Sequence, residues 1–362
     1  MSRTRSTLVR IVAGFAVLLA HLAHGEPYIA VQQGYKCDAC HFNPTGGGLR
    51  TEFGDVVSEN VLPASHIDMG GQPWLGKVGD FVRIGADLRA DWSYTDVPHT
   101  SIEKGFSLEQ IRAYADVAVI PKRLDLYVDE QLAPGGASAM EAYGRYTTAD
   151  GQWYVKGGKF YLPFGWRLQD NTAFVREVSG ISMTTPDTGV ELGFERPEWS
   201  AQLDLTNGAA NANTGSGHQI TGQAVSVHPI WRVGLGASFT QSEAGNKRVA
   251  TIFGGLRTGP VAWLAEGDIV RDLSFEPERT MLASLLEADW LVRRGHNVKL
   301  SYEYEDPDRS VHNNGETRAS ALYEFTPIQF LQLRLGYRKY KGIPQNNEQN
   351  MSLAFLEMHV FL

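Results

Sequence analysis

Cysteine is scarce in this sequence, whose 362 residues include only Cys37 and Cys40. Two cysteines three positions apart cannot staple a secreted domain with several disulfides, so their role must be local or chemical. Basic residues are also in the minority, because 33 Lys and Arg stand against 41 Asp and Glu, for a formal net charge of -8. This acidic balance argues against nucleic acid as a partner, since no excess of positive charge is available to neutralise phosphates.

Long apolar runs are absent as well. No stretch reaches 18 consecutive apolar residues, so no transmembrane helix is expected in the mature chain. The beginning of the chain instead looks like an export signal: three arginines precede an apolar stretch over residues 11–22, and small residues stand at positions 23 and 25. We therefore expect residues 1–25 to be a signal peptide, the mature chain to start near Glu26, and the protein to work outside the cytoplasm.

Hydrophobicity alternates with period two from about residue 80 to the last residue. In residues 81–94, apolar side chains alternate with charged ones, and similar runs of about ten residues follow, separated by turn-forming pairs such as Asn207-Gly208 and Gly259-Pro260. There are about 16 such runs, and nearly every one has an apolar and a charged face. The charged positions include Arg83, Asp87, Arg112, Asp116, Asp204 and Arg334.

A soluble β-sandwich would show the same alternation and remains the alternative. Three features favour a membrane barrel: the charged face recurs in nearly every run, the last run extends to the end of the chain, and aromatic residues stand near run ends, namely Trp92, Tyr94, Trp153, Trp231, Trp263 and Trp290. The sequence therefore predicts an all-β fold over residues 80–362, a transmembrane antiparallel β-barrel of about 16 strands in a Gram-negative outer membrane, with lipid around it and the charged side chains in its lumen.

Residues 26–79, between the signal and the barrel, contain the motif Cys37-Asp38-Ala39-Cys40-His41. Two thiols at this spacing can form thioether bonds to the two vinyl groups of one haem, while the adjacent imidazole coordinates its iron. The motif predicts one covalent haem c attached at Cys37 and Cys40, with His41 as an iron ligand. Residues 26–79 would then be a small monohaem c-type cytochrome domain.

Other interpretations of the two cysteines are weaker. A disulfide or a thioredoxin-like redox pair lacks the surrounding βαβ pattern and leaves His41 unexplained, and a zinc site would need further ligands at suitable spacing. The glycines at 46–48 lack the Gly-Lys-Ser/Thr ending of a phosphate-binding loop. Together with Pro44, they predict that the chain turns sharply after His41 and lies close to whatever that side chain binds.

The second axial ligand of the iron has two local candidates. His66 would give bis-histidine ligation, and Met69 would give a His/Met iron with a higher potential. The spacing of these residues does not decide between them. If neither is the ligand, a water, an open site or a histidine of the barrel remains, with His228, His296 and His359 as candidates.

The layout resembles a known family, the fused monohaem cytochrome-porins, in which one N-terminal Cys-x-x-Cys-His motif precedes a porin-like barrel. The resemblance implies electron transfer across the outer membrane between an extracellular donor or acceptor, with ferrous iron as a candidate, and a periplasmic carrier. The stretch from Gly157 to Gly165 also looks like the phosphate-selective porin class, from which only the fold is inferred.

The resulting hypothesis is an electron-transfer protein rather than a substrate-converting enzyme, with the haem inside the lumen or at its mouth. The alternative is an outer-membrane solute channel in which the haem domain is a plug or sensor, because a barrel of about 16 strands can leave an aqueous pore. A third class, a haem peroxidase, would need an open distal site with an acid-base histidine.

Overall fold

The structure, a computed structural model, describes residues 26–362 except residues 69, 71–73, 209–216 and 244. The predicted signal peptide, residues 1–25, lies outside the described residues. No described helix has both the length and the apolar character needed to cross a membrane.

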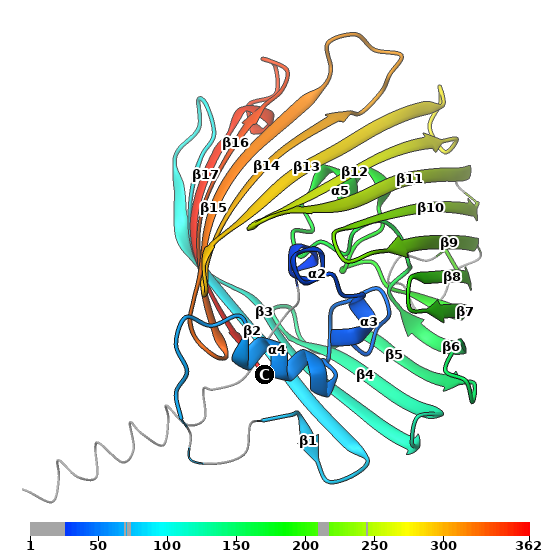
Figure 1. The fold of residues 1–362 in the computed structure, drawn as a ribbon. Coiled ribbons are helices and arrows are strands. Elements are labelled where there is room, and N and C mark those ends of the chain that lie inside the picture. The colour runs from blue at the N-terminus through cyan, green and yellow to red at the C-terminus, as the bar shows by residue number, and fades with distance from the viewer. Residues whose placement is uncertain (1–25, 69, 71–73, 209–216, 244) are drawn as a thin grey trace, which may run out of the picture.

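Sixteen antiparallel strands form a closed barrel (Figure 1). Each strand pairs with its neighbours in sequence, and the last strand pairs with the first, with Ser352 opposite Asp96 and Phe361 opposite Asp87. This confirms the predicted β-barrel and its strand number. The strands are β2 Val82–Asp96, β3 Glu103–Ile120, β4 Leu124–Ala133, β5 Ser138–Thr147, β6 Trp153–Phe160, β7 Asp187–Arg196, β8 Trp199–Thr206, β9 His218–Val227, β10 Trp231–Ser242, β11 Gly245–Thr258, β12 Val261–Asp272, β13 Arg279–Arg293, β14 His296–Asp306, β15 Glu316–Ile328, β16 Leu331–Lys341 and β17 Ser352–Phe361.

The barrel wall is apolar outside and charged inside, the reverse of a soluble sandwich. Along β8, Leu203 and Leu205 are 55% and 53% exposed, whereas Asp204 between them is 1% exposed. The inward prediction is confirmed for Asp87, Arg112, Asp116 and Arg334, which are all buried. Arg83 is half-buried and pairs with Glu52 and Asp55 of the N-terminal segment. Apolar side chains remain exposed on every strand. Lipid must cover them, because exposing such a large apolar surface to water is unfavourable.

The two ends of the barrel differ in their connections. Every connection from an odd-numbered strand to the next is a tight turn, whereas most of the others are longer loops, including residues 161–186. Exposed tryptophans gather at the tight-turn end, at or near strand ends: Trp153, Trp199, Trp231, Trp263 and Trp290. Short turns face the periplasm in outer-membrane barrels, and aromatic girdles mark the interfaces, so the tight-turn end is the periplasmic mouth.

Residues 26–60 lie inside this mouth rather than beside the barrel. Helices α2 (Pro27–Gln33), α3 (Cys37–Cys40) and α4 (Glu52–Asn60) are drawn within the ring of strands (Figure 1), and the short strand β1 (Lys77–Val78) pairs with the start of β2. Local signals set the helix ends: Pro27 begins α2, Gly34 ends it with a φ of 72°, and the Thr51 hydroxyl caps α4 by accepting from Gly54 N.

A second segment enters the lumen from the wall. After β6 ends at Phe160, residues 161–186 fold inward and carry the short helix α5 (Phe174–Ser179). Carboxylates of the opposite wall hold it: Glu266 accepts from Trp166 N at 2.9 Å and Glu303 accepts from Phe174 N at 2.9 Å. A short 3₁₀ helix, Glu348–Asn350, lies in the loop before β17.

Candidate functional site

The wall holds α2 at both ends. At its start, the Glu26 carboxylate accepts from Lys299 Nζ at 2.7 Å and pairs with Arg334 Nη2 at 3.1 Å. At its end, arginines of the wall donate to carbonyl oxygens of the helix: Arg232 to Ala30 O at 2.8 Å and Arg257 to Gln32 O at 2.9 Å. Ala30 O also accepts from Tyr35 N at 3.0 Å. These contacts fix the helix that precedes the cysteine motif.

The cysteine motif forms a single helical turn. Cys37 and Cys40 are half-buried free thiols on α3, and His41 follows directly, with its backbone N donating to Cys37 O at 2.9 Å. The chain then reverses, since Phe42 N donates to Leu49 O at 3.1 Å and Thr51 N donates to Cys40 O at 3.0 Å. The predicted sharp turn after His41 is confirmed.

The glycines at the tip of this turn allow it to lie close to the motif. Gly46, Gly47 and Gly48 have φ angles of +97°, +77° and +65°, which residues with a Cβ rarely adopt. A Cβ on Gly46 would be in van der Waals contact with Cys37 Cβ, at 3.5 Å. A Cβ on Gly48 would collide with the hydroxyl of Tyr127. The turn is therefore closely applied to the cysteines on one side and to β4 on the other.

Strands β4 and β5 hold the turn in place. Glu141 accepts from Asn43 Nδ2 at 2.7 Å, Tyr127 accepts from Leu49 N at 3.1 Å, and Arg145 donates to Phe42 O at 2.6 Å. The position of His41 thus depends on side chains roughly a hundred residues away in sequence. Such contacts cannot be recognised from the motif alone.

The environment of the motif favours uncharged side chains. His41 is 6% exposed, and burial together with the Arg50 guanidinium lowers its pKa to about 3, against the raising effect of the Gly48 and Gly47 backbone. Burial raises the pKa of Cys40 to about 11, with a further contribution from Cys37. A neutral imidazole at physiological pH is the form that binds a metal.

Cys37, Cys40 and His41 line one cavity inside the barrel mouth. Its empty volume is about 490 Å³, including space open to solvent, and Glu26, Tyr35, Lys36, Thr45, Gly47 and Arg167 also contribute to its walls. The residues present fit a haem attached at this motif: both thiols and the imidazole face one space, the glycine turn leaves room beside it, and the Nη1 and Nη2 atoms of Arg167 are buried without a hydrogen-bond partner among the described residues.

Of the two candidate second ligands, His66 is among the residues that the structure describes. His66 is exposed and does not line this cavity; its neighbour Ile67 is bound through its backbone to Gln329, in the turn between β15 and β16. Met69 lies outside the described residues. The assignment of either residue as an axial ligand stays a prediction.

The three barrel histidines also lie elsewhere. His359 is buried in the lumen beside Arg89, with 3.1 Å between His359 Nε2 and Arg89 Nη2, and His228 lies at the β9–β10 turn against Trp231. His296, the third candidate, does not face the lumen. The alternation of β14 turns Asn297 and Lys299 inward, so His296 lies on the outer face, against Phe325.

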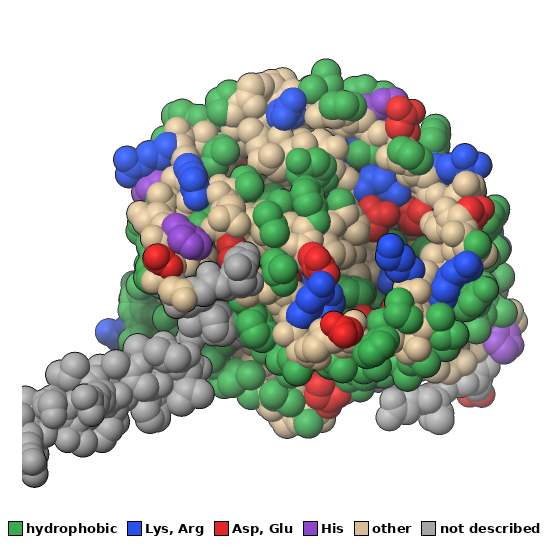
Figure 2. Space-filling model, turned by 60° about the horizontal axis from the view of Figure 1, so that its bottom comes forward, with side chains coloured by type: hydrophobic (Ala, Val, Ile, Leu, Met, Phe, Trp, Pro, Cys, Tyr) green, Lys and Arg blue, Asp and Glu red, His purple; other side chains and the backbone are tan. Residues whose placement is uncertain are grey.

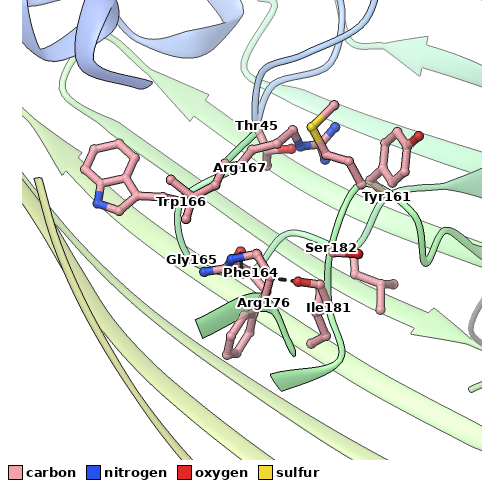
Figure 3. A pocket seen from close by; sticks show the side chains of 12 residues that line it. Thr45, Tyr161, Phe164, Gly165, Trp166, Arg167, Arg176, Ile181 and Ser182 are labelled. Carbon is pink, nitrogen blue, oxygen red and sulfur yellow. Dashed lines mark hydrogen bonds between the residues drawn. The ribbon is translucent and has the colours of Figure 1, made fainter. Parts of the chain in front are cut away.

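Sequence reasoning missed Arg167 and the inward course of residues 161–186. Figure 3 shows Arg167 next to Thr45, so this loop meets the glycine turn of the N-terminal segment in the lumen. A signal was present, because the period-two pattern stops after Phe160 and resumes only near Asp187. A long stretch without strand pattern inside a barrel sequence predicts a loop, and porin loops can fold inward to plug the lumen.

Comparison with solved structures defines the class of the fold, a porin-like outer-membrane β-barrel. OprB of Pseudomonas putida matches with a TM-score of 0.62 and 11% identity, over 78% of this chain and 94% of that chain. The outer-membrane channel DcaP of Acinetobacter baumannii matches with a TM-score of 0.60, 12% identity and coverage of 78% and 97%. An anion-selective porin from Comamonas acidovorans has a TM-score of 0.58, 10% identity and coverage of 78% and 99%.

No family model matches the chain, and no curated protein matches it. At such low identity the structural likeness shows the fold alone. The fold and the apolar outer face of the wall confirm the predicted outer-membrane location and lipid contact. The haem, its iron ligands and the electron partners remain predictions.

Proposed function

We propose that this protein is an outer-membrane cytochrome-porin, in which a single covalent haem c in the lumen passes electrons between an extracellular donor or acceptor and a periplasmic carrier. The observation that carries the proposal is that Cys37, Cys40 and His41 line one cavity enclosed by the barrel. A haem bound there supplies one-electron chemistry of its iron. The chain supplies the attachment thiols, the imidazole and a largely enclosed environment.

The filled lumen supports an electron route more than a solute route. The N-terminal segment and residues 161–186 meet inside the barrel, where Arg167 of the loop lines the same spaces as Thr45 and Gly47 of the segment. In the space-filling view, the face turned forward is covered by mixed charged and hydrophobic side chains without a wide passage (Figure 2). Electrons, unlike solutes, need no open path.

The position of α3 suits a periplasmic carrier. A depression with an empty volume of about 1220 Å³, including space open to solvent, lies next to this helix. It is lined by Lys36 and Asp38 as well as by residues 150–152 and 227–229 of two tight turns. A carrier docked at this mouth would approach the segment that bears the cysteines. An extracellular donor such as ferrous iron would have to act from the opposite end of the lumen, where the longer loops lie.

A solute channel is the second candidate, and the comparisons favour it, since the matched structures are porins and channels. In this reading, residues 26–78 are a plug. The peroxidase reading has less support, because His41 is the only histidine among the described residues that line the cavity.

Three measurements on purified protein separate the candidates. The cytochrome-porin is expected to show a dithionite-reduced haem spectrum, to be reduced by ferrous iron in a redox titration, and to conduct few ions in planar bilayers. A large steady conductance from a chain without haem absorption would establish the channel and refute the electron-transfer proposal.

A further inference from the structure

Arg167 differs from the other arginines of the lumen. Arg112 pairs with Asp129, Arg176 with Glu266, and Arg318 with Glu303 and Asp170. Arg167 has neither an ion pair nor a hydrogen bond from its two terminal nitrogens among the described residues, and both nitrogens are buried. Leaving a guanidinium buried and unpaired costs several kcal/mol, about as much as breaking a buried ion pair. An anion that completes this side chain is therefore expected.

The surroundings of Arg167 place that anion at the cysteine motif. The side chain lines the same cavity as Cys37, Cys40 and His41, and a Cβ on Gly47 would stand 3.2 Å from its Cδ. The ring of Tyr161 supports the guanidinium, with 4.8 Å from Arg167 Cζ to the ring centroid. The group is thus held by the inward loop at the edge of the space that a haem would fill.

We propose that Arg167 binds a propionate carboxylate of the haem attached at Cys37 and Cys40. The inference rests on the proposed function, because it requires that haem. A guanidinium recognises a carboxylate through two parallel N–H donors, and Arg167 has both terminal nitrogens free for this purpose. Arg50, another buried arginine near His41, is already paired with a carboxylate, since its Nε donates to Asp55 Oδ1 at 2.8 Å, although its Nη1 has no hydrogen-bond partner among the described residues.

Through this contact, residues 161–186 would help to hold the haem. The loop that narrows the lumen also fixes one edge of the haem, so the wall and the N-terminal segment hold the group together. A positive charge at the propionate edge favours the ferrous state, because adding an electron to the iron lowers the net charge of the group. Arg167 is in this sense a positioning residue that also tunes the potential.

The test compares holoprotein carrying Arg167→Gln with Arg167→Lys and with Arg248→Gln, an exposed arginine on β11. Arg167→Gln is expected to raise the ferric-to-ferrous ratio about tenfold at a fixed applied potential, equal to a midpoint about 59 mV lower for one electron. It should also shift the propionate bending band in resonance Raman spectra. Arg167→Lys should keep the ratio within about threefold, and Arg248→Gln should leave both readouts unchanged.

The outcomes distinguish failure of the proposed function from failure of the role proposed for Arg167. Wild-type protein without covalent haem would refute the proposed function. Haem-bearing protein whose potential and Raman band ignore Arg167→Gln would overturn the inference and leave the function standing. A third outcome is that added inorganic phosphate blocks the conductance of the wild type but not of Arg167→Gln, while potential and Raman band stay the same. Arg167 would then bind a free anion of the lumen, and the haem contact would be refuted.

Discussion

The barrel wall follows one rule along its whole length, whereas the N-terminal segment inside it follows no period. Most outward side chains of the wall strands are apolar and most inward ones are polar or charged, so the face on which a side chain lies decides what its replacement changes. The segment 26–78 is held instead by individual contacts, such as the arginines that bind the carbonyls of α2. The comparison teaches that the wall is specified by pattern and the site by partners from distant strands.

The largest effect is expected from removing the two thiols that attach the haem, a change that leaves the barrel wall intact. The double variant Cys37→Ala/Cys40→Ala should retain no haem after acid-acetone extraction, because both thioether bonds are lost. Each single variant should keep haem through the remaining bond. The wall should still form, which heat-modifiable migration on a denaturing gel would verify. Haem that stays bound to the double variant would contradict c-type attachment.

A charge on the lipid face should weaken the wall without touching the site. Leu203 lies near the middle of β8 and is 55% exposed on the outer face. Replacing it with Lys should cost about 2–4 kcal/mol of unfolding free energy in lipid, since a lysine near the bilayer midplane is poorly solvated. Ile230, equally exposed but in a tight turn, is the matched control, and Lys there should cost about 0–1 kcal/mol. Equal costs at both positions would contradict the membrane barrel.

Docking of the segment should depend on pH through Glu26. Although burial raises its pKa, Lys299 and Arg334 lower it to about 2 from an ordinary value of 4.5. The ionised carboxylate therefore stabilises docking above about pH 4.5, and this stabilisation, about 3 kcal/mol, is lost as the pH falls toward 2.

Hydrogen exchange of the α2 amides at pH 5 and pH 3 measures this effect. Wild-type protein should lose protection at the lower pH, whereas Glu26→Gln should be weakly protected at both. Glu278→Gln, at an exposed ion pair with Arg271, is the control and should behave as wild type. A Glu26→Gln variant with unchanged protection would show that other contacts hold α2.

The smallest effect is expected at His66. Because its side chain is exposed and does not line the cavity of His41, His66→Ala should leave the haem spectrum and potential unchanged. His41→Ala, by contrast, should abolish the native axial ligation. A shift of His66→Ala to a high-spin spectrum, with an added ligand able to bind, would identify His66 as the second axial ligand instead.

The sequence was a sufficient guide to the wall for a physical reason. In a barrel wall, whether a side chain meets lipid or the lumen depends on the face of the strand. Alternation therefore predicted the strands, the outward Leu203 and the inward Asp204. The reversal after His41 was also predictable, because glycine and proline act locally. Arg167, Glu141 and Lys299 were not recognised as parts of the site, because closure of the barrel, rather than any local signal, brings them to it.

Intact mass spectrometry of protein purified from outer membranes tests the central claim most directly. The account predicts a mature chain, beginning near Glu26, that is heavier than its sequence by one haem and has no thiol left for alkylation. A chain of unmodified mass, with both cysteines alkylated in the folded barrel, would contradict it.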